Sequence, residues 1–245
     1  MPHMLQLQYI AVIKDCYDFR DKFPEKELTA FWGRKGFLSK GELMVIGRAV
    51  NGWDDLRWKK GELDDEREIH PRVVKMRQMA ESGDKCPMNW IHEYWQRTDG
   101  NYNVARSAFW RVVKSAVLSL DRTVSESDWP SHVMWSNLYK ISPATTGNPS
   151  NALLRLQQEH CGHILLTEIS RWQPKRILML TGKDWADWFL KKLDARPAKV
   201  SGFKYVQWLG TIELSPSRPI SIVVGPHPQG KPEAPLVTEI VKAFS

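Results

Sequence analysis

The sequence predicts an α/β fold, with a doubly wound, mostly parallel sheet of about four to five strands in a three-layer α/β/α arrangement. Two observations predict it. Short apolar runs bounded by Gly and Pro recur along the chain, and amphipathic stretches of helical length separate them. This alternation is typical of parallel strands joined by crossover helices. The chain of 245 residues fits a single domain over residues 1–245.

The expected elements follow in chain order. We expect a helix around Tyr9–Arg20, a strand over 43–50, and one apolar helical face over 104–120. Pro149-Ser150-Asn151 is a helix start signal, and Pro174 ends the long helix that follows. The remaining elements are strands over 133–139, 176–181 and 219–224, a strand or hairpin over 204–214, and helices over about 151–171, 184–193 and 234–244.

Residues 54–103 interrupt this alternation. The segment is highly charged, rich in Trp and without a strand pattern. We expect a partly helical insertion over the strand ends. Carboxylates and Trp side chains together are typical of surfaces that bind sugars.

Composition limits the partners. The formal net charge of +7 suits a polyanion such as DNA, and the 12 Trp residues suit stacking on bases, although most are expected in the core. Cys16, Cys86 and Cys161 are far apart, which excludes a zinc or iron–sulfur site held by four cysteines of this chain. No apolar stretch approaches about 18 residues and no signal-peptide pattern is present, so we expect a cytoplasmic protein with no membrane partner.

Three polar motifs follow apolar runs, and each one begins where a strand is expected to end. They are Gly47-Arg48-Ala49-Val50-Asn51-Gly52-Trp53, Ser136-Asn137-Leu138-Tyr139-Lys140 and Gly225-Pro226-His227-Pro228-Gln229-Gly230-Lys231. In parallel sheets the carboxyl ends of the strands share one edge, where ligands bind. The first motif is neither a P-loop nor a dinucleotide fingerprint, because it lacks GK[ST] and GxGxxG. It presents backbone N–H groups to a ligand, or it is a simple tight turn.

Two side chains in these motifs can carry chemistry. Asn137 offers a donor and an acceptor and can read the amide-like edge of a pyrimidine, with a local cap as the alternative. His227 stands between two prolines and can donate a hydrogen bond to developing negative charge, with a surface histidine as the alternative. Lys140 suits a phosphate contact or a solvated surface.

Taken in order, the motifs resemble the uracil-DNA glycosylase superfamily over roughly residues 43–52 and 104–244. Ser107-Ala108-Phe109-Trp110-Arg111 looks like the NRFW helix start of the mismatch-specific branch. Ser136–Lys140 looks like the TNLVK strand, and His227-Pro228 looks like the HPS motif. The resemblance implies a monomeric enzyme that flips a nucleotide out of DNA and hydrolyses its N-glycosidic bond. It implies no metal and no other cofactor, and an abasic product without strand cleavage.

The resemblance also implies roles for individual residues. Asn137 reads the base edge, and His227 stabilises negative charge on the departing base. Phe109 and Trp53 are candidates for an aromatic platform under the base. The residues expected to hold the base and sugar-phosphate are Gly47, Arg48, Ala49, Val50 and Gly52, and those expected to contact DNA are Lys140, Pro228, Gln229, Gly230 and Lys231.

Two departures from the family pattern bear on chemistry and specificity. Ala49 stands where the family has an acidic or amide residue that places the water, and the nearest replacements are Asn51, Asp54 and Asp55. The two aspartates can stabilise a cationic sugar, or they form a solvated helix start. Asn51, followed by Gly52, stands where uracil enzymes carry a Tyr that excludes 5-substituted pyrimidines. A hypermodified base, such as the glucosylated hydroxymethylcytosine of phage DNA, is therefore a hypothesis, and it implies antiviral defence.

Two other functions stay open at the level of sequence. One is a non-catalytic DNA-binding protein on the same fold, which Ala49 favours. The other is an α/β enzyme that processes a small nucleotide or nucleoside, although such a ligand does not need a basic protein.

Overall fold

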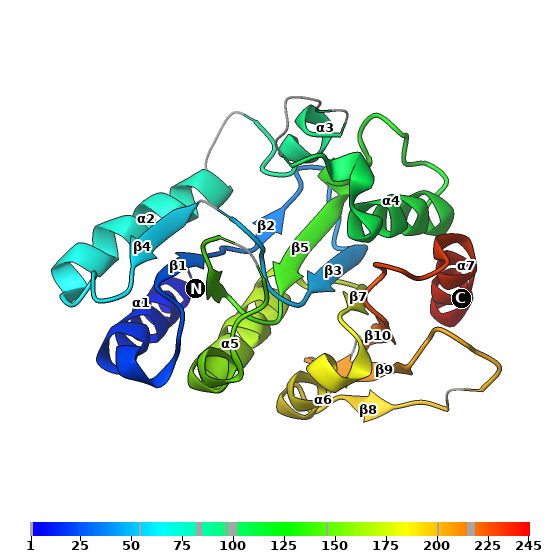
Figure 1. Ribbon diagram of the computed structural model, residues 1–245. Coiled ribbons are helices and arrows are strands. Elements are labelled where there is room, and N and C mark those ends of the chain that lie inside the picture. Colours follow the sequence, from blue (N-terminus) through cyan, green and yellow to red (C-terminus); the bar gives the residue numbers. More distant parts are fainter. Residues whose placement is uncertain are drawn as a thin grey trace. The chain divides into compact units, whose positions relative to one another are not determined.

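The computed structural model describes residues 2–53, 55–81, 85–95, 97, 102–145, 147–199, 201–214 and 219–245. Over these residues the chain forms seven α-helices and two sheets, of which one is mostly parallel at its centre (Figure 1). The predicted α/β class is thereby confirmed. The chain divides into two compact units: unit 1 comprises Met1–Gly33, Arg48–Gly83 and Ser136–Arg171, and unit 2 comprises Arg34–Gly47, Asp84–Trp135 and Trp172–Ser245.

A seven-stranded sheet organises unit 2, with the strand order β2-β5-β3-β7-β10-β9-β8. Its bounds are β2 (Arg34–Lys35), β5 (Val133–Asn137), β3 (Leu43–Gly47), β7 (Arg176–Leu180), β10 (Pro219–Gly225), β9 (Trp208–Glu213) and β8 (Arg196–Pro197). β3 and β10 pair in parallel with β7, whereas β2, β8 and β9 pair antiparallel with their neighbours. β9 lies within the predicted strand or hairpin over 204–214, whereas β2 and β8 were not predicted, so the sheet has seven strands instead of four to five.

Of the three central strands, β3 and β7 are largely apolar and buried, and β10 is buried from Ile222 to Gly225. β3 is buried throughout, and so is β7 after its first residue, which is the pattern of strands covered on both faces. Met179 of β7 lies opposite Ile46 of β3 and opposite Val224 of β10. Because this register is level, the carboxyl ends of β3, β7 and β10 reach the same edge of the sheet.

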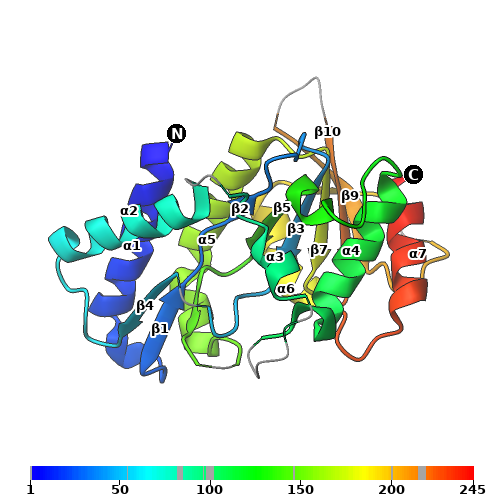
Figure 2. The ribbon, with the colours of Figure 1, turned by 90° about the horizontal axis from the view of Figure 1, so that it is seen from above.

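The helices of unit 2 are α3 (Trp90–Glu93), α4 (Ala108–Leu120), α6 (Lys183–Lys192) and α7 (Glu233–Phe244). α4 and α7 lie side by side in both views (Figures 1 and 2). α4 buries Val112, Val113, Ala116 and Val117, which the predicted helical face included, and also Trp110, which it did not include. The predicted helices at 104–120, 184–193 and 234–244 are confirmed to within a few residues at each end.

Unit 1 contains α1 (Pro2–Asp18), α2 (Glu66–Glu81) and most of α5 (Asn151–Trp172). It also holds an antiparallel sheet of order β4-β1-β6, formed by β4 (Leu56–Lys59), β1 (Glu27–Ala30) and β6 (Ile141–Pro143). Its core includes Tyr9, which stacks on Trp32 with a ring-centroid distance of 4.6 Å. Glu81 accepts a hydrogen bond from Trp32 and pairs with Arg171, which links α2, the segment after β1, and α5.

The segment over 54–103 differs from the prediction. It contains a strand, β4, in which Leu56 and Trp58 are buried while Arg57 and Lys59 are exposed. The segment is also divided, since its first part belongs to unit 1 and its last part to unit 2. The expectation of a strand-free insertion is therefore wrong, and the single domain over 1–245 stays a prediction. None of the described helices is long and apolar enough to cross a membrane.

Gly36→Ala tests the attachment of β2 to its neighbouring strand. A Cβ atom at position 36 is placed 2.2 Å from the backbone oxygen of Ser131, so backbone must move to admit it. We expect a loss of about 1–3 kcal/mol in the free energy of unfolding, measured by urea denaturation. Gly225→Ala is the matched control, because its Cβ meets its nearest neighbour, Leu236, at 3.4 Å. Equal stability of the two variants contradicts the prediction.

Candidate functional site

The carboxyl edge of the parallel strands in unit 2 is where the topology favours a ligand. From β3 the chain crosses to β5 on one side, whereas from β7 it crosses to β10 on the other side. In open α/β sheets the crevice at such a switch point is the usual ligand site. Gly47, Gly182 and Gly225 lie at this edge, because they end β3, follow β7 and end β10.

The ends of β7 and β10 are tied together directly before the histidine motif. The backbone N–H of Gly182 donates to the carbonyl oxygen of Gly225 at 2.9 Å. Gly182 has a φ of 83°, a left-handed conformation that glycine adopts without strain. This bond fixes the point from which the chain leaves β10 toward His227.

The predicted histidine loop is rigid and turns tightly. Pro226 and Pro228 are buried, and His227 between them is half-buried. The backbone N–H of Gln229 donates to Nδ1 of His227 over 3.4 Å, and the N–H of Lys231 donates to the oxygen of Pro228 at 2.9 Å. An imidazole whose Nδ1 accepts carries its proton on Nε2 when it is neutral. His227 is thereby set up as a donor through Nε2.

The far end of this loop is anchored by an ion pair. Glu233, in the first turn of α7, accepts from Nε of Arg111 at 3.0 Å and from Nη2 at 2.5 Å. This pairing raises the pKa of Arg111. Phe109 lies nearby in sequence on α4, half-buried, with its ring edge-on to Trp110 at a centroid distance of 5.0 Å.

Asn137, the last residue of β5, carries the most informative polar atom of unit 1. The residue is 2% exposed, and its Nδ2 is a buried donor with no acceptor among the described residues. A buried donor without a partner costs free energy, and such atoms are rare in native interiors. An acceptor on a bound ligand removes that cost, which supports the predicted reading role of Asn137.

Lys140 has an internal role instead of the predicted contact with DNA. Its side chain is 0% exposed, and its ammonium donates to Ser136 Oγ at 2.6 Å, to the carbonyl oxygen of Asn137 at 2.8 Å and to Glu168 Oε2 at 2.8 Å. An ammonium has three donors, and all three are used. An ammonium buried in this way cannot also contact a phosphate. The structure therefore contradicts the predicted phosphate contact of Lys140.

The first predicted loop lies against the chain that follows Asn137. Tyr139 donates its backbone N–H to the oxygen of Arg48 at 2.9 Å. The exposed Asn51 accepts from the backbone N–H of Gly147 through Oδ1 at 3.1 Å. Gly52 has a φ of 65°, and a Cβ there meets the oxygen of Thr145 at 3.1 Å. Of the other residues, Val50 is buried, Ala49, Trp53 and Asp55 are half-buried, and Asp54 lies outside the described residues.

The predicted residues thus fall into two sets. Those in unit 2 are Gly47, Phe109, His227, Pro228, Gln229, Gly230 and Lys231; those in unit 1 are Arg48, Ala49, Val50, Asn51, Gly52, Trp53, Asp55, Asn137 and Lys140. No family model and no curated protein matches the chain. The assignment of roles therefore depends on the geometry of each set.

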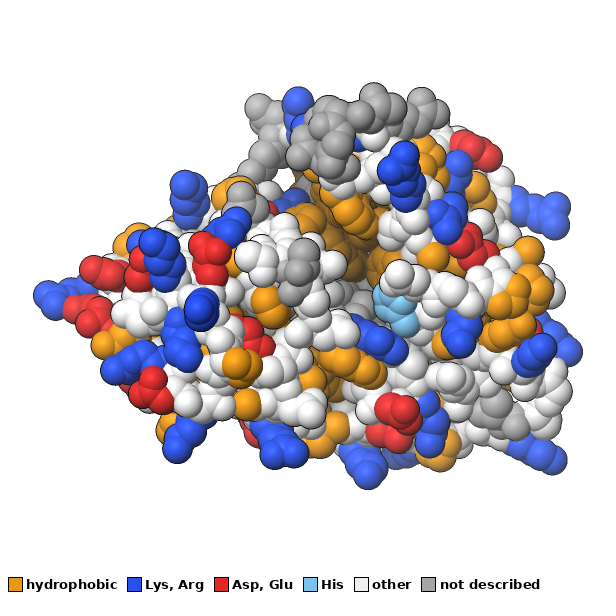
Figure 3. Space-filling model, in the orientation of Figure 1, with side chains coloured by type: hydrophobic (Ala, Val, Ile, Leu, Met, Phe, Trp, Pro, Cys, Tyr) orange, Lys and Arg blue, Asp and Glu red, His pale blue; other side chains and the backbone are white. Residues whose placement is uncertain are grey.

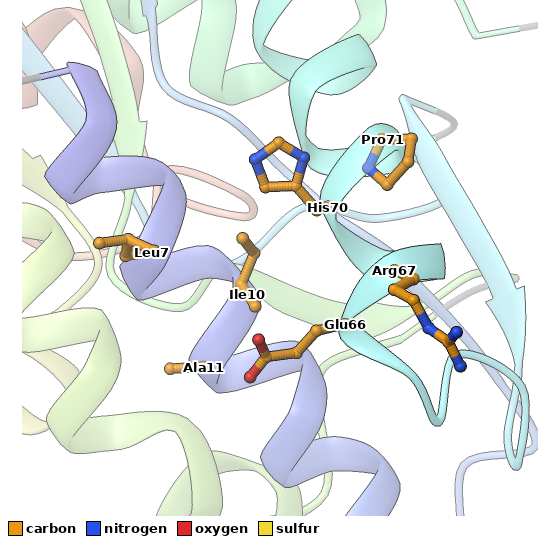
Figure 4. A pocket seen from close by; sticks show the side chains of 7 residues that line it. All are labelled: Leu7, Ile10, Ala11, Glu66, Arg67, His70 and Pro71. Atoms are coloured by element: carbon orange, nitrogen blue, oxygen red, sulfur yellow. The ribbon is translucent and has the colours of Figure 1, made fainter.

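An open pocket of about 550 Å³ lies elsewhere in unit 1, between α1 and α2 (Figure 4). Glu66 and His70 extend from α2 toward α1, whereas Arg67 points away and pairs with Asp65. None of the residues that line this pocket belongs to the predicted site. Across the described parts of the chain, no three His, Cys, Asp or Glu side chains gather so that they could hold a metal ion.

Sequence reasoning missed the partners of Lys140. Glu168 lies on the buried stripe of α5 beside Ile164, Leu165 and Ile169, and it is 1% exposed. A carboxylate on an apolar stripe indicates a buried, paired charge, and this signal is present in the sequence. Arg111 was noticed only as part of a motif, because its partner Glu233 lies far along the chain.

The tautomer of His227 is directly measurable. Because Nδ1 accepts from the N–H of Gln229, we expect the neutral ring to be protonated at Nε2. Long-range ¹H–¹⁵N correlation spectra at alkaline pH distinguish the two ring nitrogens. Gln229→Pro removes the N–H donor and is expected to shift the population toward the other tautomer. A neutral ring protonated at Nδ1 in the unaltered protein contradicts the prediction.

Proposed function

We propose that the protein is a monofunctional DNA glycosylase that flips out a uracil-like or 5-modified pyrimidine, hydrolyses its N-glycosidic bond and leaves an abasic site. The observation that carries this proposal is the buried Nδ2 donor of Asn137 at the end of β5, for which the described residues offer no acceptor. The family resemblance of the ordered motifs adds support. A three-layer, doubly wound arrangement, action as a monomer and a cytoplasmic location belong to the same proposal.

The donor chemistry fits departure of a base. When the bond between C1′ of the sugar and the base nitrogen breaks, the base keeps the electron pair and becomes negative. A donor aimed at a carbonyl oxygen of the base then binds more strongly in the transition state than in the ground state. Nδ2 of Asn137 is proposed as such a donor, and Nε2–H of His227 is a second candidate.

The water that attacks C1′ must lose a proton and be oriented. Ala49 has no polar side chain, so orienting the water passes to Asn51, whose Oδ1 keeps a second lone pair beside its bond to Gly147, or to Asp55. An amide oxygen does not take up the proton, so the proton goes to the carboxylate of Asp55 or to the departing base anion. Asp54, the third candidate, lies outside the described residues. The absence of a carboxylate from residues 48–53 favours one second candidate function, a DNA-binding protein that recognises a flipped base without cleaving it.

DNA contact is proposed to centre on the histidine loop. Gln229, Gly230 and Lys231 are exposed at its tip, while Pro228 is buried and stiffens it. On the face drawn in Figure 3, Lys and Arg side chains are spread out with acidic side chains between them. The positive charge on that face is therefore not one continuous patch. The burial of Lys140 fits a hydrolytic enzyme, since this amine is held away from any sugar carbon.

The first loop bears on the substrate. Asn51 and Gly52 are exposed, and the φ of 65° together with the nearby Thr145 oxygen disfavours a larger residue at position 52. Small residues at positions 51 and 52 leave room for a substituent at C5 of a pyrimidine. We therefore include glucosylated hydroxymethylcytosine among the proposed substrates, and with it a proposed role in antiviral defence.

Base release tests the proposed function. Duplex DNA containing uracil, mismatched DNA and phage DNA with glucosylated hydroxymethylcytosine are incubated with the protein, and free bases are detected by mass spectrometry. We expect release of a pyrimidine, and a decrease of about 10²–10³-fold in His227→Ala, the loss seen when one oxyanion donor is removed. Asn137→Ala is expected to lose release similarly while retaining DNA binding.

Lys191→Ala, a change of an exposed cation on α6, is the control and is expected to release bases at the normal rate. Binding of DNA without release of any base contradicts the proposal and supports the non-cleaving alternative. Release that persists in both Asn137→Ala and His227→Ala excludes these residues from the site.

Asn51→Tyr tests whether the small residue at position 51 admits a 5-substituted pyrimidine. The larger ring is expected to lower release of a 5-substituted pyrimidine at least about tenfold more than release of uracil, because a steric block in a pocket discriminates at that level, whereas loss of the water-orienting amide lowers release of both. The measurement is kcat/KM on both substrates. An equal loss on both substrates contradicts a specificity role for position 51.

A further inference from the structure

We propose that Ser136, Lys140 and Glu168 form a buried positioning cluster that fixes Asn137 for recognition of the base. None of the three was predicted to act in this way from the sequence. The inference rests on the proposed function, since it assigns to these residues the geometry of the side chain that reads the ligand.

Ser136 and Lys140 of the cluster lie on either side of Asn137 in the sequence, and the cluster holds the main chain of Asn137. Ser136 precedes it and donates from Oγ to Glu168 Oε2 at 2.6 Å. Lys140 follows it by three residues and donates to its carbonyl oxygen at 2.8 Å. Both residues converge on the same carboxylate of α5, so the peptide on either side of Asn137 is tied to one point.

A second set of bonds holds the chain after the cluster. Gln157 Oε1 accepts from the backbone N–H groups of Lys140 at 3.1 Å and Ile141 at 2.8 Å. Its Nε2 donates to the oxygen of Ile141 at 2.7 Å. The segment from Asn137 to Ile141 therefore has few ways to move relative to α5, and all of these groups belong to unit 1.

Stability alone does not account for such a cluster. Replacing a buried ion pair with packed apolar side chains is often neutral or stabilising, because desolvation offsets the attraction. Here the pairing is also incomplete, since Oε1 of Glu168 is buried with no partner among the described residues. In the cluster, a charged donor holds the carbonyl oxygen of Asn137. This bond fixes the orientation of the peptide at Asn137, which apolar packing does not do. A reading side chain must be held within about 0.5 Å of its productive position.

The test compares one double variant with its single parent. Lys140→Met leaves the carboxylate of Glu168 buried without its cation, so this variant is expected to unfold. Lys140→Met combined with Glu168→Leu removes both charges and is expected to fold, with a melting temperature near that of the unaltered protein. We expect its kcat for base release to fall about 10²-fold, the loss typical of a misplaced reacting geometry, with KM within about threefold. An unchanged kcat in the folded double variant overturns the inference.

A single, milder substitution provides the test if the double variant does not fold. Ser136→Ala removes one acceptor of Lys140, whereas Ser142→Ala changes another fully buried serine of unit 1 that makes no contact with the cluster in the described bonding. We expect lower kcat only in Ser136→Ala. Equal kcat in the two variants overturns the positioning role.

A readout without substrate separates this inference from the proposed function. In the DNA-free protein, the side-chain amide of Asn137 is expected to give one sharp pair of ¹H–¹⁵N signals, which broaden or shift in the double variant and in Ser136→Ala. If the Asn137 signals change in these variants but the unaltered protein releases no base, the proposed glycosylase activity is refuted and the positioning role is retained. An Asn137 signal that is the same in all folded variants refutes the positioning role itself.

Discussion

The buried ammonium of Lys140 constrains the end of β5 through three hydrogen bonds. Its side chain is 0% exposed, so its donors need acceptors inside the protein, and three acceptors come from Ser136, Asn137 and Glu168. A shift of the strand end relative to α5 breaks at least one of these bonds. Because an uncompensated buried charge costs several kcal/mol, the arrangement has little freedom to relax. The position of Asn137 follows from this constraint.

A different device fixes the other proposed donor. In unit 2 the level register of β3, β7 and β10 brings three strand ends to one edge, and the bond from Gly182 to Gly225 closes the last two. Two buried prolines then leave His227 little conformational freedom, and the N–H of Gln229 selects its tautomer. Both donors are thus oriented by the protein before any ligand arrives, which is the condition for stabilising charge that develops only in the transition state.

Much of this arrangement could be predicted from the sequence. The central strands are long apolar runs, and the helix at Asn151 begins after a clear start signal, so both were found near their true ends. β4 was missed because its alternation covers only Leu56 to Lys59 within a charged segment. β2 and β8 span two residues each, too few for any periodic pattern, and they form only because β5 and β9 offer free edges.

The candidate site could likewise be predicted only in part from the sequence. Asn137 and His227 were predicted because each follows an apolar run, and strand ends are determined locally. Lys140 was misjudged because its environment depends on Glu168, which is far along the chain and close only after α5 has packed. A lysine next to polar residues gives the same local signal whether it is solvated or buried. Long-range pairing of this kind requires the fold to be known first.

The central claim is that the Nδ2 donor of Asn137 receives an acceptor from a flipped base. The most direct measurement is a crystal structure of the protein bound to a duplex that carries 2′-fluoro-deoxyuridine, in which the glycosidic bond resists cleavage. We predict an extrahelical uracil with a carbonyl oxygen at about 2.9 Å from Nδ2 of Asn137. A uracil that stays stacked in the duplex, or that is flipped but far from Asn137, contradicts the claim.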